Sequence, residues 1–368
     1  MRSLCSDERF SQILNFAKAY TGLGTALYFK GNYKIFVKEE LLDSVKLLAD
    51  QALQLDSNTD EAYFLLGSYF IHKGNNEEGM AAFHSALKIN PNYADVMMEL
   101  GFFNTAIVQD FVTGLSQMHQ AVQRNRGPEL ATYLHTIGFI YSSLGMFDKA
   151  KEVDDKATLL DGDTTSRNYH RSMLYRYNRQ YEDALNLLNA LYLQDSSYFG
   201  IYDDRAHLLS DLGRYKEALD IRLRWRKSHP DDPISDYHRI GFLYSKLGDE
   251  KTARKYFDEM IAYCEESIRL KQIQAQWKGT QYDLAGMYAY LGDKEKAFRY
   301  LEEVNNQKLV PYWLFALMKE DQLFDPIRHD ERYKKIERDM EDKLKFERGR
   351  VQQWLDTENL TAKIEAKR

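Results

Sequence analysis

Small residues recur along this chain at intervals of 34 residues, and this period constrains the fold more than any other feature. Four alanines mark it, three of them 34 residues apart and the last one residue late: Ala150, Ala184, Ala218 and Ala253. A glycine stands twelve residues before two of these alanines, at Gly138 and Gly241. A unit of this length forms two antiparallel helices that cannot bury their apolar face alone, so neighbouring units must stack. The period therefore predicts an all-α solenoid.

A stop signal appears at the same place in several units. The dipeptide Leu-Gly ends the expected first helix at 144–145, 212–213, 247–248 and 291–292. Glycine adopts the left-handed conformation at little cost, so each dipeptide predicts a helix end followed by a turn. No alternating β-branched run persists beyond a few residues, which argues against strands.

The same residues resemble the tetratricopeptide repeat family, whose pattern places bulky residues, Leu-Gly, Tyr, Ala and Pro at fixed positions of a 34-residue unit. The stretch 60–93 is close to a full match, through Tyr63, Leu66, Gly67, Phe70, Gly79, Phe83, Ala86 and Pro91. Two further stretches match well and four are weaker copies: 131–164 and 234–267, then 94–130, 165–198, 199–233 and 278–311. The resemblance implies a right-handed superhelix (α-solenoid) of about eight helix-turn-helix repeats with a C-terminal capping helix.

Departures from the period divide the chain into three expected parts. Residues 1–58 form a divergent first helix pair with an enlarged loop within Phe29–Glu40, residues 59–311 hold the repeats, and residues 312–368 form a C-terminal cap and charged helix. Ten extra residues between Ala253 and Ala297 predict a second helix that extends through Ile268, Ile273 and Trp277. This longer helix is interpreted as a packing variation or, alternatively, as a docking ridge.

The expected cap has two apolar features. Four residues are expected to be buried against the second helix of the last repeat: Tyr312, Trp313, Leu314 and Leu317. The charged helix that follows carries an apolar stripe at Ile336, Met340, Leu344, Val351 and Leu355. A solenoid needs a terminal element with a polar outer face, and this composition provides one.

Composition limits the kinds of partner and compartment. The 50 basic and 56 acidic side chains give a net charge of −6, too mild and too mixed to favour nucleic acid or an anionic membrane. No run approaches the ~20 apolar residues that cross a bilayer, so we expect no membrane insertion. The two cysteines, Cys5 and Cys264, are too few for a disulfide framework and favour a reducing, cytoplasmic location. Cys264 lies on an apolar helix stripe and is expected in the core.

Motifs for catalysis and for cofactor or metal binding are absent from the sequence. The nine histidines form no His-Glu-x-x-His, and neither Cys-x-x-Cys nor Gly-x-Ser-x-Gly occurs. The acidic pairs Asp154-Asp155, Asp203-Asp204 and Asp231-Asp232 stand among basic residues and are interpreted as solvated helix faces or helix starts. We therefore expect no enzyme activity, no catalytic residue, no cofactor and no metal.

Protein binding is the function that the repeats favour. In the family, certain positions of each first helix line the concave face because they are not used for packing against the paired helix. In this sequence they form an aromatic, His-containing groove with few charges: Phe64, His72, Phe102, His135, Phe139, Tyr169, Met173, Arg176, Tyr177, His207, His238, Phe242, Lys246 and Tyr282. The groove lacks the Lys and Asn pairing of repeats that clamp acidic chaperone tails, so an extended or helical peptide with apolar anchors fits better. Alternatively, tight superhelical winding covers part of this stripe.

A further resemblance suggests a second function. Three phrases, Ala-Leu-x-Leu-Asp at 52–56, Ala-Leu-x-Ile-Asn-Pro at 86–91 and Phe-Asp-Pro-Ile-Arg-x-Asp-x-Arg-Tyr at 324–333, resemble the C-terminal repeat regions of bacterial signalling proteins. In that group the repeats follow a cyclase, kinase or winged-helix domain. The resemblance implies either the sensory or regulatory half of a larger signalling protein or a free-standing relative of such repeat regions, and both alternatives stay open. The identity of the protein or peptide partner and the oligomeric state stay open.

Overall fold

The computed structural model describes the chain at residues 17–32, 39–125, 127–162, 164–194, 199–229, 236–270, 275 and 278–365. Within these residues every regular element is helical, as the period predicted. Successive helices of the described chain form seven pairs with these bounds: α2 (Ala17–Asn32) and α3 (Glu39–Leu55), α4 (Asp60–His72) and α5 (Asn76–Ile89), α8 (Leu130–Ser143) and α9 (Phe147–Asp161), α10 (Thr165–Tyr177) and α11 (Tyr181–Gln194), α12 (Phe199–Asp211) and α13 (Tyr215–Ser228), α14 (Tyr237–Lys246) and α15 (Glu250–Arg269), α17 (Gly279–Tyr290) and α18 (Lys294–Asn305). Between α5 and α8 in the sequence lie α6 (Ala94–Phe103) and α7 (Phe111–Arg124). The other elements are a π-helical turn, a short helix, a 3-10 turn and a long helix: η1 (Asn104–Val108), α19 (Tyr312–Glu320), η2 (Gln322–Phe324) and α20 (Glu331–Glu365). In the described ranges we find no helix whose length and apolar character would let it cross a membrane.

The chain divides into two compact units. The first contains the residues up to Phe103 together with Gln117–Asn125, and the second contains Asn104–Ser116 and the chain from residue 126 onwards. The division therefore falls after α6 and again within α7. The three parts expected from the sequence follow the repeat pattern instead, and they stay a prediction.

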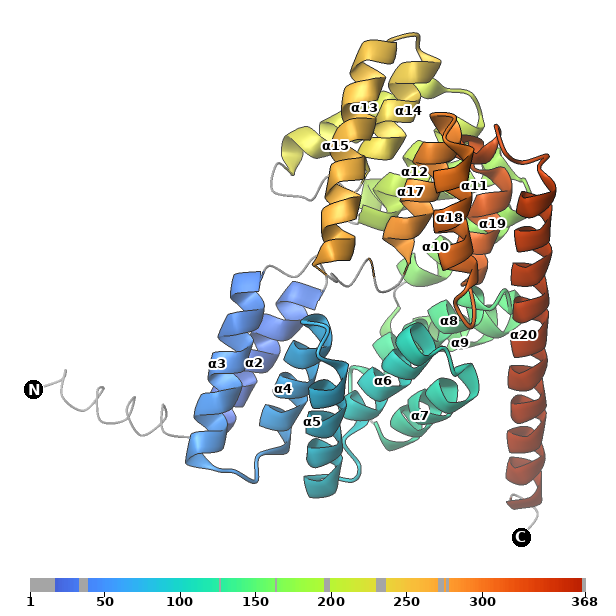
Figure 1. Cartoon of the computed structure of the whole chain (residues 1–368). Coiled ribbons are helices and arrows are strands. Elements are labelled where there is room, and N and C mark those ends of the chain that lie inside the picture. The colour runs from blue at the N-terminus through green and yellow to red at the C-terminus, as the bar shows by residue number, and fades with distance from the viewer. Residues whose placement is uncertain are drawn as a thin grey trace, which may run out of the picture. The chain divides into compact units, whose positions relative to one another are not determined.

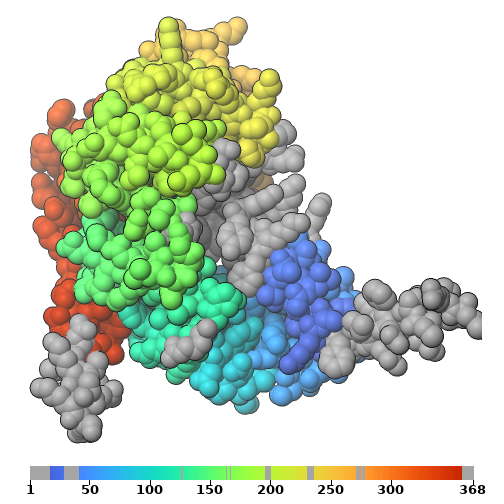
Figure 2. All heavy atoms as spheres, turned by 180° about the vertical axis from the view of Figure 1, so that it is seen from behind, coloured from blue at the N-terminus to red at the C-terminus, as the bar shows by residue number. Residues whose placement is uncertain are grey.

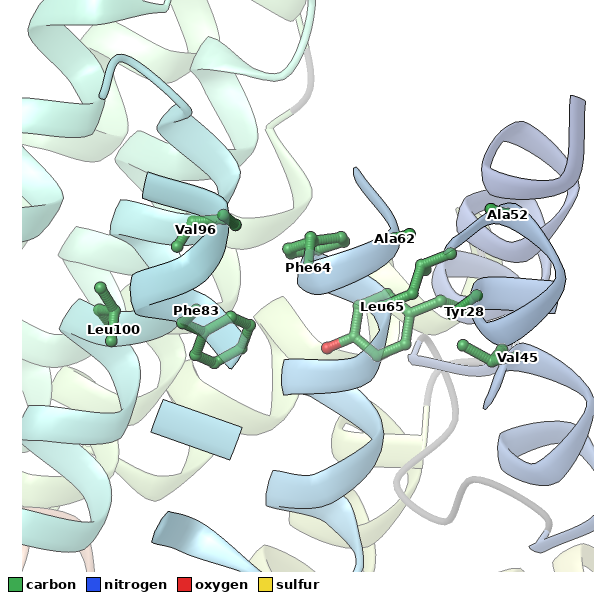
Figure 3. Packing of buried hydrophobic residues seen from close by; sticks show 11 residues of the cluster. Tyr28, Val45, Ala52, Ala62, Phe64, Leu65, Phe83, Val96 and Leu100 are labelled. Atoms are coloured by element: carbon green, nitrogen blue, oxygen red, sulfur yellow. The ribbon is translucent and has the colours of Figure 1, made fainter. Parts of the chain in front are cut away.

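The core of the first unit lies among α2 to α6, and Figure 3 shows its buried side chains. Gly67 lets α4 approach α5 closely, because a Cβ at this position would stand 2.4 Å from the ring of Phe83. The ring of Phe64 lies 5.7 Å from Tyr28, edge to face, and 5.6 Å from Tyr93. Phe64 is 1% exposed, so it belongs to the core, which corrects its expected place on a groove.

In the second unit, glycines again let two paired helices approach closely, and the side chain that faces the glycine differs between the two pairs. A Cβ at Gly241 of α14 would stand 3.3 Å from the ring of Phe257 in α15. At the matching place α9 carries Asp154, and a Cβ at Gly138 of α8 would stand 2.6 Å from its carboxylate oxygen. A carboxylate thus takes the position of the aromatic ring. Asp154 is 1% exposed, which corrects its interpretation as a solvated residue.

The first helices of four pairs end just before the glycines that were expected to stop them. Four of these glycines have φ angles of 73°, 73°, 88° and 88°, at Gly145, Gly213, Gly248 and Gly292. These angles lie in the left-handed region, so the turns predicted from Leu-Gly are confirmed.

The longer second helix is only partly as expected. α15 has 20 residues, compared with 14 in α13, and Cys264 on its inner face is buried as predicted. The helix includes Ile268 and is described as far as Arg269, and the expected extension through Ile273 and Trp277 lies outside the described residues. Residues 271–274 and 276–277 lie outside the described part of the chain, as do residues 33–38 of the expected enlarged loop.

The charged helix expected at the C-terminus is α20, which packs against α18 and α19 (Figure 1). Its apolar stripe is buried, with exposed fractions of 0–8% at Ile336, Met340, Leu344, Val351 and Leu355. Figure 2 shows the other side of the same unit, where the green and yellow residues of α8 to α15 form a continuous surface.

Candidate peptide-docking surface

The chain that follows the last repeat lies against helices that come much earlier in the sequence. The C-terminal segment is defined here as Gln307–Phe324, which includes α19 and η2. Within the second unit it meets the α6–α7 connection first, then α8 to α11, and finally α12 to α17. Ten of the residues that contact it are defined here as the docking surface: Gln109, Gly145, Phe147, Tyr177, Arg179, Tyr181, Tyr215, Arg239, Tyr282 and Gly286.

The docking surface begins with a buried side-chain amide that binds the backbone of the segment. Gln109, which follows η1, donates to the carbonyl oxygen of Leu309 at 2.6 Å. Its own carbonyl oxygen accepts from the backbone N–H of Leu309 at 2.8 Å. Because the amide satisfies both backbone groups of one residue, it recognises an extended chain whatever the side chain is.

Tyr312 fills a slot between α8, α9 and α10. Its ring lies 5.5 Å from Phe147 and 5.2 Å from Tyr177, in both cases edge to face. The slot is open because Gly145 has no side chain: a Cβ there would stand 2.9 Å from the Tyr312 ring. Each such ring pair contributes about 0.5–1.5 kcal/mol beyond the burial of apolar area.

Two adjacent acidic side chains of the segment bind different parts of the surface. Glu320 accepts hydrogen bonds from Arg179 at 3.1 Å and from the Tyr181 hydroxyl at 2.9 Å. Asp321 accepts from Arg239 at 2.8 Å and from the Tyr282 hydroxyl at 3.0 Å. Burial raises the pKa of Asp321, but Arg239 and the hydrogen bonds outweigh it and hold that pKa below its usual value. Asp321 is therefore ionised and paired inside the protein.

The last residues of the segment pack on α17. A Cβ at Gly286 would stand 3.3 Å from the Leu323 side chain, and the Phe324 ring lies 5.3 Å from Tyr282. Leu323 and Phe324 are almost fully buried. The glycine therefore makes room for an apolar pair, in the way that Gly145 makes room for Tyr312.

Beneath the segment lies a layer of buried charges and a small cavity. The cavity has room for about one water molecule, roughly 20 Å³. Burial raises the pKa of Asp211 to about 6 and that of Asp283 to about 7, although Arg176 and Arg239 respectively act in the opposite direction. The sequence predicted a groove with few charges, and these buried ion pairs correct that prediction.

Four of the predicted groove residues lie at this site. Tyr177 contacts Tyr312, and Tyr282 binds Asp321 and is 3% exposed. Phe242, which is 4% exposed, and His207 line the cavity together with Leu317 and Asp321 of the segment. The chain's own C-terminal segment therefore covers this part of the predicted groove.

Several predicted groove residues, His207 among them, lie close to acidic side chains of the second unit. The Tyr169 hydroxyl lies 2.7 Å from the Asp204 carboxylate, and the Arg176 guanidinium lies 3.3 Å from the carboxylates of both Asp204 and Asp211. The histidine rings lie 3.8 Å from Asp203 for His207, 3.4 Å from Asp283 for His238 and 3.1 Å from Asp154 for His135. His238 is 5% exposed, so it does not line an open groove. Four of these residues link one helix to another, whereas His207 and Asp203 both lie in α12.

The remaining predicted residues show no common site. His72 is half-buried and its Nδ1 lies 2.9 Å from the Ser68 carbonyl oxygen, while Phe102 and Met173 are half-buried. Phe139 and Lys246 are exposed, and the Lys246 ammonium lies 5.2 Å from the centre of the Phe242 ring.

A separate polar cluster joins three successive helices of α8 to α10. The Asp154 carboxylate lies 3.1 Å from Nδ1 of His135 and 2.6 Å from Nδ1 of His170. Both histidines lower the pKa of Asp154 and overcome the opposing effect of burial. The cluster links one repeat to the next. Among the described residues no group of three His, Cys, Asp or Glu side chains is arranged to hold a metal ion.

Gln109, Arg179 and Arg239 were not predicted as site residues, and the segment lies elsewhere than predicted. Tyr312 and Leu314 were expected against α18, but α19 packs on α8 and α20, and Trp313 is 37% exposed. No local pattern marks these contacts, because the bonded residues are as many as 200 positions apart.

Comparisons with known proteins identify the repeat. Residues 60–93, 131–164 and 237–266 match the profile described as tetratricopeptide repeat. No curated protein matches the sequence. Among solved structures, the human IFIT1 dimer with m7Gppp-AAAA is 14% identical, with a TM-score of 0.53 over 78% of this chain and 71% of that chain. A tetratricopeptide repeat protein from Parabacteroides merdae is 17% identical, with a TM-score of 0.47 over 69% and 98%. PilF from Pseudomonas aeruginosa is 17% identical, with a TM-score of 0.40 over 71% and 97%.

The two kinds of comparison support different statements. The similarity to IFIT1 concerns the fold alone, since the identity is low. The profile matches fall on α4–α5, α8–α9 and α14–α15, where the glycine contacts described above occur. The chain is therefore an all-α solenoid of sequential helix pairs that carries tetratricopeptide repeats in these three segments.

Proposed function

We propose that this chain is a protein-interaction module and that its docking surface binds a segment of a protein partner that, like Gln307–Phe324, is extended at its start and contains a short helix. The observation that carries this proposal is the C-terminal segment, which follows the order of the repeats from Gln109 to Gly286. Tetratricopeptide repeats are known as scaffolds for protein partners, and here the chain supplies an example of a bound segment itself.

The contacts each suit a particular chemical group of the segment, which the burial of apolar area alone would not require. The amide of Gln109 binds backbone, the slot at Gly145 accepts an aromatic ring, and Arg239 pairs with a buried carboxylate. A capping element needs only to cover apolar area, whereas these three contacts each require a particular group at a particular place. In this proposal a partner segment competes with the C-terminal segment for the same surface.

The proposal changes the groove predicted from the sequence. Tyr177, Phe242 and Tyr282 keep the role of partner-binding residues, while Phe64 is assigned to the core of the first unit. The surface that binds a partner is thus less apolar than expected, because Arg179 and Arg239 add two positive charges.

The test is binding of a fluorescent peptide with the sequence 307–324 to the full chain, measured by anisotropy. The receptor carries Tyr312→Ala and Asp321→Asn, which weaken its own segment. We expect this opened chain to bind the peptide at least about 100-fold more tightly than the parent, whose tethered segment competes at a millimolar effective concentration.

Two controls decide the outcome. Lys149→Ala with Glu152→Ala, on the outward part of α9, should leave peptide binding to the opened chain unchanged. Adding Tyr177→Ala to the opened chain should weaken it, because Tyr312 of the peptide loses a ring partner. If the opened chain keeps its helical content and binds no peptide, the docking surface does not recognise segments in trans and the proposal fails.

A further inference from the structure

We infer that the docking surface selects partners with two adjacent acidic residues, then any residue, then an apolar residue and an aromatic residue. The C-terminal segment shows this motif as Glu320-Asp321-Gln322-Leu323-Phe324. The inference rests on the proposed function, since it specifies the partner class for the same surface.

The two carboxylates differ in what they contribute. Arg179, the partner of Glu320, has a side chain that is 73% exposed, so this ion pair is screened by water and contributes little. Arg239 and Asp321 have side chains that are 11% and 2% exposed. An Arg–carboxylate pair at this depth discriminates strongly, because removing one partner leaves the other charge buried and unpaired. The second acidic position therefore determines specificity.

The site favours a carboxylate over a larger or more highly charged anion. Arg239 is shared with the acidic neighbours Asp211 and Asp283, which reduce the positive charge available to a ligand. The space beside the pair, roughly 20 Å³, holds about one water molecule, and a phosphate group needs more room. A phosphorylated residue at the second acidic position is excluded on both grounds.

The surface recognises the last two residues of the motif by their shape. Gly286 leaves room for Leu323, and the ring of Tyr282 meets Phe324 edge to face while its hydroxyl binds Asp321. One tyrosine therefore contacts both the carboxylate and the aromatic residue, which fixes the two-residue spacer between them. Gln322, at the free position, makes only long hydrogen bonds of 3.3 and 3.4 Å to Tyr215 and Ser210.

The test uses the opened chain with peptides of residues 307–324 that differ at one position. The Asp321→Asn peptide should bind roughly 30-fold or more weakly than the native peptide, and the Glu320→Gln peptide only a few-fold more weakly. A peptide with phosphoserine at 321 should bind no better than the Asn peptide. Placing Arg239→Gln in the receptor should remove most of the difference between the Asp and Asn peptides, since the cycle isolates this pair.

The outcomes separate the inference from the proposed function. Equal binding of the native and Asp321→Asn peptides would overturn the motif while the docking surface stands. Absence of binding by every peptide would overturn the docking surface itself. If the opened chain does not fold, a milder receptor with Tyr312→Phe and Glu320→Gln gives the same comparison, and its helical content and melting temperature verify the fold.

Discussion

The close approach of α8 and α9 gives a sharp test of the packing between paired helices. We predict that Gly138→Ala destabilises the second unit, because a Cβ would stand 2.6 Å from a carboxylate oxygen of Asp154. Asp154 cannot move away freely, since hydrogen bonds at 3.1 and 2.6 Å hold it to His135 and His170. Overpacking costs about 1–3 kcal/mol, and weakening hydrogen bonds to a buried charge adds about 1.5–3 kcal/mol. The better helix propensity of alanine offsets about 1 kcal/mol of this cost, so the net loss of stability is about 1.5–5 kcal/mol.

A matched control is available in the same unit. Gly349 lies in α20, and a Cβ there meets nothing within 4 Å, so Gly349→Ala should stabilise the chain by about 1 kcal/mol. Urea unfolding followed by circular dichroism measures both variants against the parent. A Gly138→Ala chain as stable as the parent would refute the assigned register, since the position would then have room for a side chain.

Three further predictions follow from buried groups and from the segment. Asp283, whose pKa is raised to about 7, binds a proton in the folded protein that the unfolded chain has lost above about pH 4, so stability falls as pH rises to about 7. As the pH rises across this window, Asp283→Asn should therefore become more stable relative to the parent, by up to ~1.4 kcal/mol per pH unit in urea titrations. A stability difference between variant and parent that does not change with pH would contradict the burial of Asp283. Gln109→Ala should speed amide exchange at Leu309, since the N–H loses its acceptor, and unchanged exchange would show that the contact is not formed. A chain ending at residue 310 should associate in light scattering because it exposes the apolar surface under α19, and a monomer of normal helical content would argue against this.

The sequence predicted the parts of the fold that repeat. The helix pairs, the left-handed glycines such as Gly145 and the burial of Cys264 all follow from a local pattern or a 34-residue spacing. The buried Asp154 could not be predicted, because a polar residue at one core position looks like a surface residue until its histidine partners are known.

The candidate site was predicted only in part. Tyr177, Phe242 and Tyr282 were found because they occupy repeat positions, but the C-terminal segment that covers them lies outside the period. Its contacts join residues far apart in the sequence, and such contacts leave no periodic signal. The expected link to bacterial signalling proteins stays a prediction.

Hydrogen exchange of the C-terminal segment tests most directly whether it occupies the docking surface. Exchange by residues 307–324 in the intact chain is compared, by mass spectrometry, with exchange by a free peptide of the same sequence. The account predicts exchange on the order of 100-fold slower or more in the chain, with protection lost in Arg239→Gln while α2 to α5 remain unchanged. Exchange in the intact chain at the rate of the free peptide would contradict the account, because the segment would then not be docked.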